Sequence, residues 1–420
     1  MRCGRAFDAT QPTRHDVGPL RRPLAAARSL RTVHSILGSA TKQPACRSDA
    51  PLSANLPASS LGPIESVTAP ESANAPESAD APERDDRPGS ADRATAARPP
   101  IRPDEADRDD FGGEYPFRGF FLDLPAAGTI ETAGKTSHEA ETVALHFLDE
   151  GPRDAPPLLL VHGNPTWSFA WRNLIKGLAG DFRCVAVDHI GCGRSDKPPR
   201  FDSDKPEAGG YPYRLAQHRN NLQTLIETLD LRDATLIAHD WGGAIGCAAA
   251  GELFERFASV VLMNTAAFPA GEMPWRIAAC RVPVLGPLGV RGLNGFARAA
   301  LSMAVEKPLP ADVRRGYLAP YSSWGDRVAI QAFVDDIPMS REHPSWDALE
   351  ECERKLPNLA AKRILLPWGE KDWCFTTAFR DRFVERFPGA IVQRFPEAGH
   401  YVFEDAATEL LVTLKAFLRR

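Results

Sequence analysis

Beyond about residue 110, short apolar runs alternate with stretches in which apolar residues recur every three or four positions. The runs at 120–124 and 143–148 predict two opening antiparallel strands. Six shorter, mostly continuous runs follow, at 158–161, 184–187, 235–238, 260–263, 364–366 and 391–395. Continuous runs of this length are typical of parallel strands covered on both faces. Between them, Leu222, Leu225, Ile226 and Leu229 have helical spacing, as do Phe379, Phe383 and Phe387. The alternation predicts a doubly wound α/β fold with a mostly parallel sheet.

One long interval breaks this rhythm. Between the strand that ends near Met263 and the strand that begins near Arg363, the chain is rich in helical patterns and prolines. The segments at 293–301 and 328–334 are its clearest helices. We expect an inserted helical cap lobe at about 268–358, which would lie over the active site and form most of the wall of the substrate pocket.

The beginning of the chain has a different composition. Residues 1–106 show no sustained apolar period, are dominated by Ala, Pro, Ser, Arg and Asp, and contain a near-repeat at 69–80. Such a segment buries too little apolar surface to offset its chain entropy. The sequence therefore predicts a disordered extension over 1–106 and one folded domain over 107–420. The Arg-rich stretch up to Arg31 faintly resembles an organelle transit peptide, but Asp8 and Asp16 argue against it. A start codon placed too far upstream is the alternative.

Charge and cysteine usage exclude several classes of protein. The formal net charge of −5 argues against a nucleic-acid partner. The eight cysteines include no CxxC pair and no histidine at zinc spacing, so we expect neither a metal nor a cofactor. Cys184 and Cys247 lie in apolar patterns typical of reduced core residues. No apolar run is long enough to span a bilayer. These features favour a cytoplasmic location.

The segment 238–243, Ala-His-Asp-Trp-Gly-Gly, places an aspartate where many hydrolases have a serine. A short apolar strand precedes Asp240, and a helix of small residues starts at Trp241. A strand, a sharp turn with the reactive side chain at its apex and a helix make up the nucleophile elbow. A carboxylate there would form an ester intermediate. Alternatively, Asp240 would merely cap the helix.

A nucleophilic aspartate needs donors that hold developing charge. Asn164 lies in His-Gly-Asn-Pro, directly after the first core strand, so its backbone N–H and its side-chain amide can point at Asp240. With the backbone N–H of Trp241, the Asn164 N–H would form an oxyanion pair. The Trp241 indole and the Asn164 amide would form a second, neutral pair suited to a leaving anion. Asn164 as an ordinary turn residue is the alternative.

The nucleophile also needs a base and an acid that orients the base. His400 follows Gly399 past the last strand, where it can reach back over the sheet as general base. Asp372, after the strand at 364–366, is the preferred acid, and Glu370 is the alternative. The other place for an acid, after the strand at 260–263, is occupied by Asn264, which cannot ionise. No Gly-x-Ser-x-Gly motif is present, so a serine mechanism has no elbow.

The glycine-rich loop at 188–195 lacks the lysine and the spacing of a phosphate-binding loop. We interpret it as a structural turn near the site.

Three segments closely resemble the haloalkane dehalogenases: His-Gly-Asn-Pro-Thr-Trp-Ser at 162–168, Asp-His-Ile-Gly-Cys-Gly-Arg-Ser-Asp-Lys-Pro at 188–198 and His-Asp-Trp-Gly-Gly at 239–243. With Gly-His-Tyr at 399–401, the resemblance covers about 110–420 and implies an α/β-hydrolase fold. It implies that Asp240 is the nucleophile, His400 the base, and Asn164 with Trp241 the halide clamp. The late acid Asp372 and this clamp resemble the third dehalogenase subfamily, which includes the β-lactone decarboxylases of bacterial long-chain olefin synthesis. Similarity to those decarboxylases extends to segments at 264–269, 336–339 and 343–345.

The resemblance implies a hydrolase acting on a small apolar substrate. As a haloalkane dehalogenase, the first expectation, it would form an alkyl ester on Asp240 and hydrolyse it to an alcohol. As a cis-β-lactone decarboxylase, the alternative, it would release carbon dioxide and an alkene, in the company of other enzymes of an olefin pathway. Epoxide hydrolases share the aspartate elbow but need two acidic phenols, for which Tyr317 and Tyr321 are candidates. A receptor or scaffold without activity is the non-enzyme alternative, but every member of the triad is retained.

Overall fold

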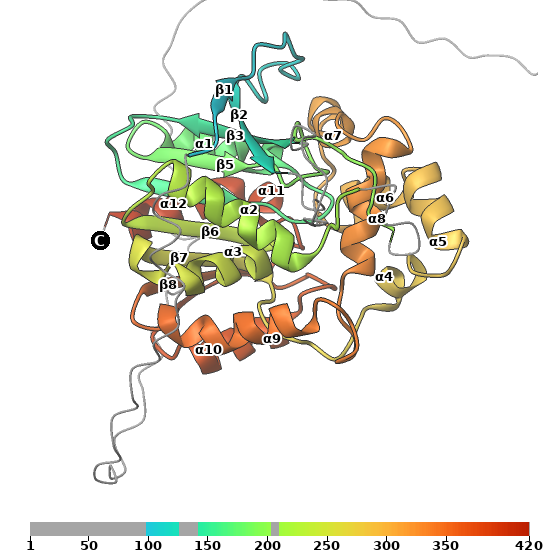
Figure 1. Ribbon diagram of the computed structural model, residues 1–420. Coiled ribbons are helices and arrows are strands. Elements are labelled where there is room, and N and C mark those ends of the chain that lie inside the picture. Colours follow the sequence, from blue (N-terminus) through green and yellow to red (C-terminus); the bar gives the residue numbers. More distant parts are fainter. Residues whose placement is uncertain (1–97, 126–141, 203–209, 420) are drawn as a thin grey trace, which may run out of the picture. The chain divides into compact units, whose positions relative to one another are not determined.

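The computed structural model describes residues 98–125, 142–202 and 210–419. Their framework is a sheet of nine strands in the order β1-β2-β3-β5-β4-β6-β7-β8-β9 (Figure 1). The strands are β1 (Ile101–Pro103), β2 (Gly119–Pro125), β3 (Thr142–Glu150), β4 (Pro157–Val161), β5 (Arg183–Val187), β6 (Ala234–Asp240), β7 (Phe257–Thr265), β8 (Arg363–Gly369) and β9 (Ile391–Phe395). The pairs from β1 to β5 are antiparallel, and the rest, from β5–β4 to β8–β9, are parallel. All eight strands predicted from apolar runs are confirmed.

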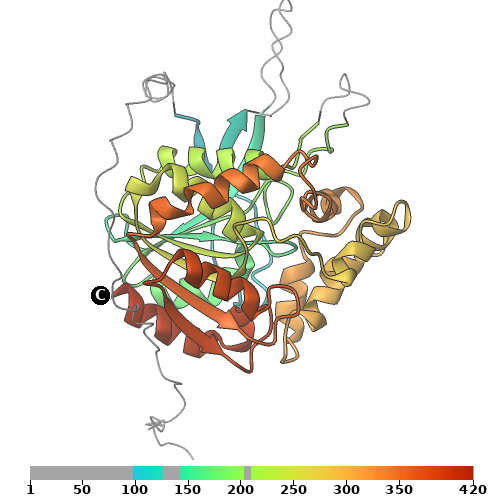
Figure 2. The same ribbon diagram turned by 90° about the horizontal axis from the view of Figure 1, so that it is seen from below.

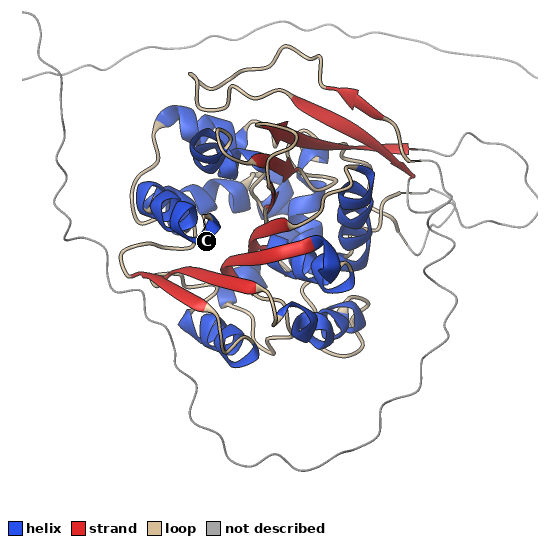
Figure 3. Ribbon diagram, turned by 90° about the vertical axis from the view of Figure 1, so that its left-hand side faces the viewer, coloured by secondary structure: helices blue, strands red, loops and turns tan. Residues whose placement is uncertain are grey.

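Successive residues of the central strands point to opposite faces, so the sheet has a core on each side. Leu158 and Leu160 of β4 belong to one buried cluster, whereas Leu159 and Val161 belong to the other. Helices lie on both faces of the sheet (Figure 3). This double cover explains why the strand sequences are almost continuously apolar rather than alternating.

Twelve α-helices are present in the described residues: α1 (Arg172–Leu178), α2 (Leu215–Thr228), α3 (Trp241–Glu252), α4 (Trp275–Ala279), α5 (Leu285–Pro287), α6 (Gly295–Met303), α7 (Ala311–Leu318), α8 (Val328–Asp335), α9 (Trp346–Lys355), α10 (Thr377–Arg386), α11 (Val402–Asp405) and α12 (Ala407–Leu418). Residues of α2, α3, α9 and α10 pack in one core cluster, and residues of α1 and α12 pack in the other. The fold is the predicted doubly wound α/β arrangement.

The long interval between β7 and β8 holds helices α4 to α9. Helices α4 to α8 gather on one side of the sheet, at the right of Figure 1. We call residues 266–345 the cap. The predicted cap range, 268–358, also included α9. In α9, however, Leu349 and Cys352 are buried in the same core cluster as α3, and the Cys352 thiol lies 3.6 Å from the carbonyl oxygen of Ala244. Helix α9 is therefore part of the layer on the sheet, and the cap ends before it.

The folded domain starts earlier than the predicted residue 107. Strand β1 pairs with β2, with Ile101 opposite Leu122. Asp104 is buried, and its backbone N–H donates to the Gly119 carbonyl at 2.8 Å. The described strands thus begin several residues before the predicted boundary at 106. The disorder expected farther upstream concerns residues outside the described part of the chain, as does the resemblance to a transit peptide. No helix among the described residues is long and apolar enough to cross a membrane.

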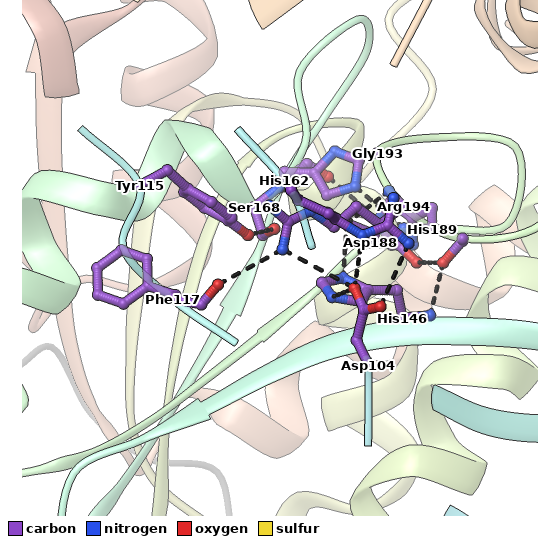
Figure 4. Close-up of polar contacts among 12 residues, drawn as sticks. Asp104, Tyr115, Phe117, His146, His162, Ser168, Asp188, His189, Gly193 and Arg194 are labelled. Atoms are coloured by element: carbon purple, nitrogen blue, oxygen red, sulfur yellow. Dashed lines mark hydrogen bonds and ion pairs between the residues drawn. The ribbon is translucent and has the colours of Figure 1, made fainter. Parts of the chain in front are cut away.

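The glycine-rich loop after β5 wraps around the buried carboxylate of Asp188 (Figure 4). Asp188 accepts hydrogen bonds from the backbone N–H groups of Ser168 at 2.7 Å and Arg194 at 2.9 Å, and it lies 2.8 Å from Nδ1 of His146. A Cβ atom at Gly193 would meet this carboxylate at 2.3 Å, so the residue must be glycine. Burial alone would raise the pKa of Asp188, but these hydrogen bonds and the neighbouring histidines lower it well below 3.8. The loop is a structural turn that anchors the segment after β4.

Candidate active site

Asp240 lies at the apex of a sharp turn between β6 and α3. Its backbone has φ 53° and ψ −129°, a conformation that costs energy for a residue with a side chain. The turn is tight: a Cβ atom at Gly163 would meet Asp240 Oδ1 at 2.1 Å, and one at Gly242 would meet the Val161 carbonyl oxygen at 2.1 Å. The carbonyl of Asp240 accepts a 2.5 Å hydrogen bond from the Thr265 hydroxyl. The carboxylate is therefore held at the strained point of an elbow, rather than in a simple helix cap.

Two backbone N–H groups donate to this carboxylate. The N–H of Asn164 donates to Asp240 Oδ1 at 2.7 Å, and the N–H of Trp241 also donates to the carboxylate. Both donors come from turns that follow parallel strands, β4 and β6, whose carboxyl ends meet at this edge of the sheet. The other oxygen, Oδ2, faces His400, whose Nε2 lies 3.8 Å away.

Behind His400 lies Asp372. The Nδ1–H of His400 donates to Asp372 Oδ2 at 2.8 Å, and the Asp372 side chain is buried. Glu370, the alternative acid, is instead bound by Arg380 at 2.8 Å and by Arg394 at 2.7 Å. The geometry thus brings together Asp240, His400 and Asp372 and leaves Glu370 outside.

Two partners of Asp372 were not apparent from the sequence. The Asn264 side-chain amide donates to Asp372 Oδ2 at 2.9 Å and to the Gly369 carbonyl at 2.9 Å, while its own oxygen accepts the Gly369 N–H at 2.9 Å. The backbone N–H of Cys374 donates to Asp372 Oδ1 at 2.7 Å. Asn264 therefore cannot be the acid itself, but its neutral amide holds the acid Asp372 in place through a hydrogen bond.

His239, the residue before Asp240, was also missed. Its Nε2–H donates to the carbonyl oxygen of His400 at 2.9 Å, and the two rings lie 4.4 Å apart between centroids. Burial lowers the pKa of His239 well below 6.5, so this ring stays neutral. Phe375 stacks on the other side of His400 with its ring centroid at 5.7 Å. The base is thus fixed through both its backbone and its ring.

The electrostatics of the site couple Asp240 to His400. Burial raises the pKa of Asp240 above its usual 3.8, although His400 and the two N–H donors act in the opposite direction. For His400, burial favours the neutral ring, but the charges of Asp372 and Asp240 outweigh it and raise the pKa above 6.5. A histidine with this environment can take up a proton as a base and carries its positive charge more readily than a free imidazole.

The two side chains predicted to form an anion clamp line the site. One N–H of the Asn164 amide donates to the Ile330 carbonyl in α8 at 3.2 Å, which leaves its second N–H for a ligand. Trp241 lies beside Phe333, with ring centroids 5.4 Å apart, and lines the same space as Asp240. Both donors are neutral. Among the described residues, no cluster of His, Cys, Asp or Glu is suited to hold a metal ion.

Two apolar cavities meet at Asp240. Cavity A, of about 130 Å³, extends past Trp241, Ala266, Phe268, Val334 and Met339. Cavity B, of about 350 Å³, extends between α4, α5 and α6 past Leu285, Val290, Leu293 and Ala299. Asp240 and Asn164 line both cavities, and His400 lines cavity B. The nucleophile therefore faces a forked, largely apolar space in which the cap forms much of the wall.

The two phenols required by the epoxide alternative point elsewhere. The Tyr317 hydroxyl donates to Glu404, and the Tyr321 hydroxyl donates to the Thr166 carbonyl at 3.3 Å. Neither residue lines cavity A or cavity B. Burial raises the pKa of both phenols well above 10, which is the opposite of what an acid that protonates an epoxide oxygen needs. The geometry does not support this alternative.

Known proteins resemble about two thirds of the chain. Residues 156–280 match the alpha/beta hydrolase fold family. The cis-3-alkyl-4-alkyloxetan-2-one decarboxylase of Xanthomonas campestris pv. campestris is 39% identical over 282 residues, which is 66% of this chain and 93% of the relative. The haloalkane dehalogenase of Mycobacterium marinum is 34% identical over 312 residues, 70% of this chain and 92% of the relative. The crystal structure of the haloalkane dehalogenase DatA from Agrobacterium tumefaciens C58 has the same fold, with a TM-score of 0.61, 23% identity, and coverage of 74% of this chain and 99% of that one.

Proposed function

Because the chain belongs to the α/β-hydrolase-fold family of haloalkane dehalogenases and cis-3-alkyl-4-alkyloxetan-2-one decarboxylases, and is an enzyme of that family, we propose that it decarboxylates a cis-3,4-dialkyl β-lactone. Asp240 is the nucleophile in this proposal, His400 and Asp372 complete the triad, and Asn164 and Trp241 stabilise the anion that develops. The reaction would release carbon dioxide and an alkene.

The forked space at Asp240 is the observation that favours a dialkyl β-lactone as the substrate. In a cis-3,4-dialkyl oxetan-2-one, the two adjacent ring carbons each bear an alkyl chain, and the chains leave the ring in different directions. With the ring at Asp240, one chain fits cavity A and the other fits cavity B, and both cavities are lined mainly by apolar side chains. A terminal haloalkane has a single chain and would fill one cavity only. The relatives with the higher identities, 39% and 36%, are named as decarboxylases of such lactones.

The chemistry can proceed in two steps without water. In the first, Asp240 Oδ2 attacks ring carbon C4, the C4–O bond breaks, and its electron pair passes to the ring oxygen, which becomes part of a free carboxylate on C3. In the second, the bond between C3 and this carboxylate breaks and carbon dioxide leaves. The electron pair forms the C3=C4 double bond while the ester bond to Asp240 breaks. The carboxylate of Asp240 is restored, and no proton is gained or lost.

The groups around Asp240 are suited to stabilise the charges that form in these two steps. The N–H of Asn164 holds Asp240 Oδ1 and the N–H of Trp241 also donates to the carboxylate, while Oδ2, which faces His400, is the oxygen that attacks. The free N–H of the Asn164 amide and the Trp241 indole are neutral donors for the new carboxylate. A protonated His400, favoured by Asp372 and Asp240, adds a positive charge beside the reacting carbons.

Haloalkane dehalogenation is the second candidate, and the same triad supports it. There, Asp240 Oδ2 displaces halide from an sp³ carbon, and the neutral pair of Asn164 and Trp241 receives the halide. The ester must then be hydrolysed, so neutral His400 takes a proton from water, which attacks the ester carbonyl. The pairing of His400 with buried Asp372 at 2.8 Å is the arrangement that such a base requires.

The deciding experiment supplies both substrates to the purified protein. We expect a synthetic cis-3,4-dialkyl β-lactone to yield alkene, measured by gas chromatography with mass spectrometry, much faster than a panel of 1-haloalkanes yields halide. Asp240→Asn should abolish both reactions. In His400→Gln, a haloalkane should leave an alkyl adduct on the peptide carrying Asp240, because attack by water is blocked.

Faster halide release than alkene formation would instead establish the dehalogenase. An adduct on another peptide, with Asp240→Asn still active, would remove Asp240 as the nucleophile.

We place this reaction in the reducing cytoplasm, because Cys184, Cys192, Cys247 and Cys352 are buried and free. The lactone must come from a reaction that closes a four-membered ring on a long-chain hydroxy acid. Such an enzyme is the kind of pathway partner that the function requires.

A further inference from the structure

Exposed apolar side chains concentrate on one part of the cap. Twelve large apolar side chains are exposed in the described part of the chain, and seven of them lie between residues 275 and 303: Trp275, Val282, Val284, Leu285, Leu288, Leu293 and Met303. They lie in α4, α5, the π-helical turn Leu288–Gly292 and α6, and in the short connections between these elements. Figures 1 and 2 show α4 and α5 at the outer edge of the cap, away from the sheet. We call this surface the cap face.

These side chains do little for the fold itself. Val284 is 78% exposed, Trp275 is 74% exposed and Leu293 is 71% exposed. Val284 also has φ 67°, a left-handed conformation that is unfavourable for a β-branched residue. Neither burial nor backbone conformation in the free protein accounts for valine at this position. Contiguous exposed apolar surface of this kind marks a site of interaction.

Within the segment that forms the cap face all charged residues are basic, and the nearest acids along the chain, Glu272 and Glu306, lie just outside it. From Met273 to Val305 the sequence contains four arginines, Arg276, Arg281, Arg291 and Arg298, and no acidic residue, although the whole chain has a net charge of −5. In the described part of the chain, the contacts of three of these guanidinium groups are with aromatic rings and backbone carbonyls. Arg276 lies over the rings of Trp275 and Trp373, Arg291 lies over Trp324, and Arg281 donates to the Ile337 carbonyl. Their charges are thus available to an anionic partner.

Cavity B opens among these same side chains. Its lining includes Arg276, Leu285, Leu293 and Met303, all of them at the exposed surface, and it leads inward to Asp240 and His400. An apolar molecule that reached the cap face would therefore meet a continuous apolar path to the nucleophile.

We propose that the cap face binds the surface of an anionic phospholipid bilayer, so that a water-insoluble substrate passes from the lipid directly into cavity B. Exposed Trp and Leu side chains enter the boundary between headgroups and acyl chains, where amphipathic aromatic rings are favoured. The arginines contact lipid phosphates, as basic residues do at the cytoplasmic leaflet. The absence of any acid from this segment favours an anionic lipid surface over a protein partner of mixed charge.

The test uses the full chain and vesicles without any lactone, so its outcome does not depend on the proposed reaction. In a flotation assay, the protein should bind vesicles of phosphatidylcholine mixed with phosphatidylglycerol, and bind vesicles of phosphatidylcholine alone much more weakly. Salt at about 1 M, where the Debye length is about 3 Å, should release it. Fluorescence of the exposed Trp275 and Trp324 should shift to the blue on binding.

Two variants test the face itself. Arg298→Glu should weaken binding at least about fivefold, since one basic residue contributes about that factor at an anionic surface. The double variant Val284→Gly, Leu288→Gln should weaken it at least about tenfold. Glycine suits the positive φ at residue 284, and neither residue lines cavity A or cavity B, so folding and turnover of a short lactone in solution should be unchanged.

The matched controls are Val412→Gln, at an exposed position in α12, and Arg232→Glu, at an exposed position before β6. Both should bind like the unchanged protein. The proposal is overturned if anionic vesicles do not bind the protein, or if the cap-face variants bind as well as the controls. It is equally overturned if those variants abolish a concentration-dependent dimer while vesicles remain unbound, because the occupant of the face would then be a second copy of the chain.

Discussion

At the scale of single residues, the choice between Asp372 and Glu370 has a measurable consequence. Asp372→Asn removes the charge that pairs with His400 at 2.8 Å, and loss of a triad acid typically lowers kcat by about a thousandfold or more. Glu370→Gln removes only the partner of Arg380 and Arg394. It should stay within roughly tenfold of the unchanged enzyme. Steady-state kinetics of haloalkane hydrolysis, the reaction in which His400 acts as base, decides, and the reverse ranking would move the acid to Glu370.

The raised pKa of His400 predicts different pH profiles for the two candidate reactions. Alcohol formation from a haloalkane needs neutral His400, so its rate should rise with pH through a value above 6.5 and then level off. Alkene formation from a β-lactone needs ionised Asp240, whose raised pKa starts from 3.8, and is assisted by protonated rather than neutral His400. Its acid limb should therefore lie at lower pH. Measuring both rates on one preparation checks this, and coincident profiles would mean that both reactions need the same protonation state of His400.

The sequence could place the site residues because each follows a strand, and parallel strands end at a common edge. It could not reveal the partners that hold Asp372. The hydrogen bond from Asn264 joins residues 108 positions apart, and the one from Cys374 uses a backbone N–H that has no sequence signature. The sequence identified Asn264 only as a residue that cannot ionise. Its role as a donor follows from the packing of β7 beside β8.

At the scale of elements, the apolar runs predicted the core strands because both faces of the sheet are covered, so that burial leaves a continuous signal. The same periodicity could not assign α9 to its layer. An amphipathic pattern shows that a helix buries one face, but not which surface it packs against. Leu349 and Cys352 give α9 such a face, and packing on α3 rather than on the cap is visible only in three dimensions.

The forked cavity predicts that its two arms can be blocked one at a time. Ala266 lines only cavity A, and Ala299 of α6 lines only cavity B. Ala266→Leu and Ala299→Leu form a matched pair, because each adds the same volume to one arm. Lengthening the chain that enters the open arm should still lower KM, by about 0.8 kcal/mol or about fourfold per buried CH₂. Lengthening the chain that enters the blocked arm should not.

The measurement is KM for two series of lactones, in which the C3 chain or the C4 chain is lengthened separately. We expect each variant to lose the response to one series and keep the response to the other. If both variants lose the response to the same series, both chains share one cavity, and the forked site does not distinguish lactones from haloalkanes.

At the scale of the whole molecule, the apolar pattern did not predict the strand that precedes residue 107. Strand β1 is only three residues long and all three are exposed, so it carries no apolar pattern. Strand β1 contributes to the domain by pairing with β2 at the edge of the sheet and by positioning Asp104, the residue that follows it. Asp104 is buried and holds Arg108 at 2.8 Å, and its carboxylate lies 3.9 Å from both His146 Nε2 and Arg194 (Figure 4). One polar residue thus joins the edge strand to the network around Asp188.

This connection predicts a sharp difference between two truncations. Removal of residues 1–97 keeps β1 and Asp104, so thermal stability and turnover should match those of the full chain. Removal of residues 1–106 deletes the pairing of β1 and takes the carboxylate from beside His146, whose Nε2 has no hydrogen-bond partner among the described residues. Loss of a partner from a buried charged network costs about 1–3 kcal/mol. For a domain of this size, Tm should fall by about 2–4 °C per kcal/mol.

Differential scanning calorimetry of the two truncated proteins makes the comparison, and Asp104→Asn in the full chain is its control. The Asp104 variant should reproduce part of the loss seen when 1–106 are removed, because it keeps the pairing of β1 and removes only the charge. Equal stability of the two truncated proteins would mean that β1 and Asp104 add nothing to the domain. The boundary at residue 106 would then describe the stable unit after all. Alkene formation measured on the same samples separates stability from catalysis, since neither truncation removes a residue that lines cavity A or cavity B.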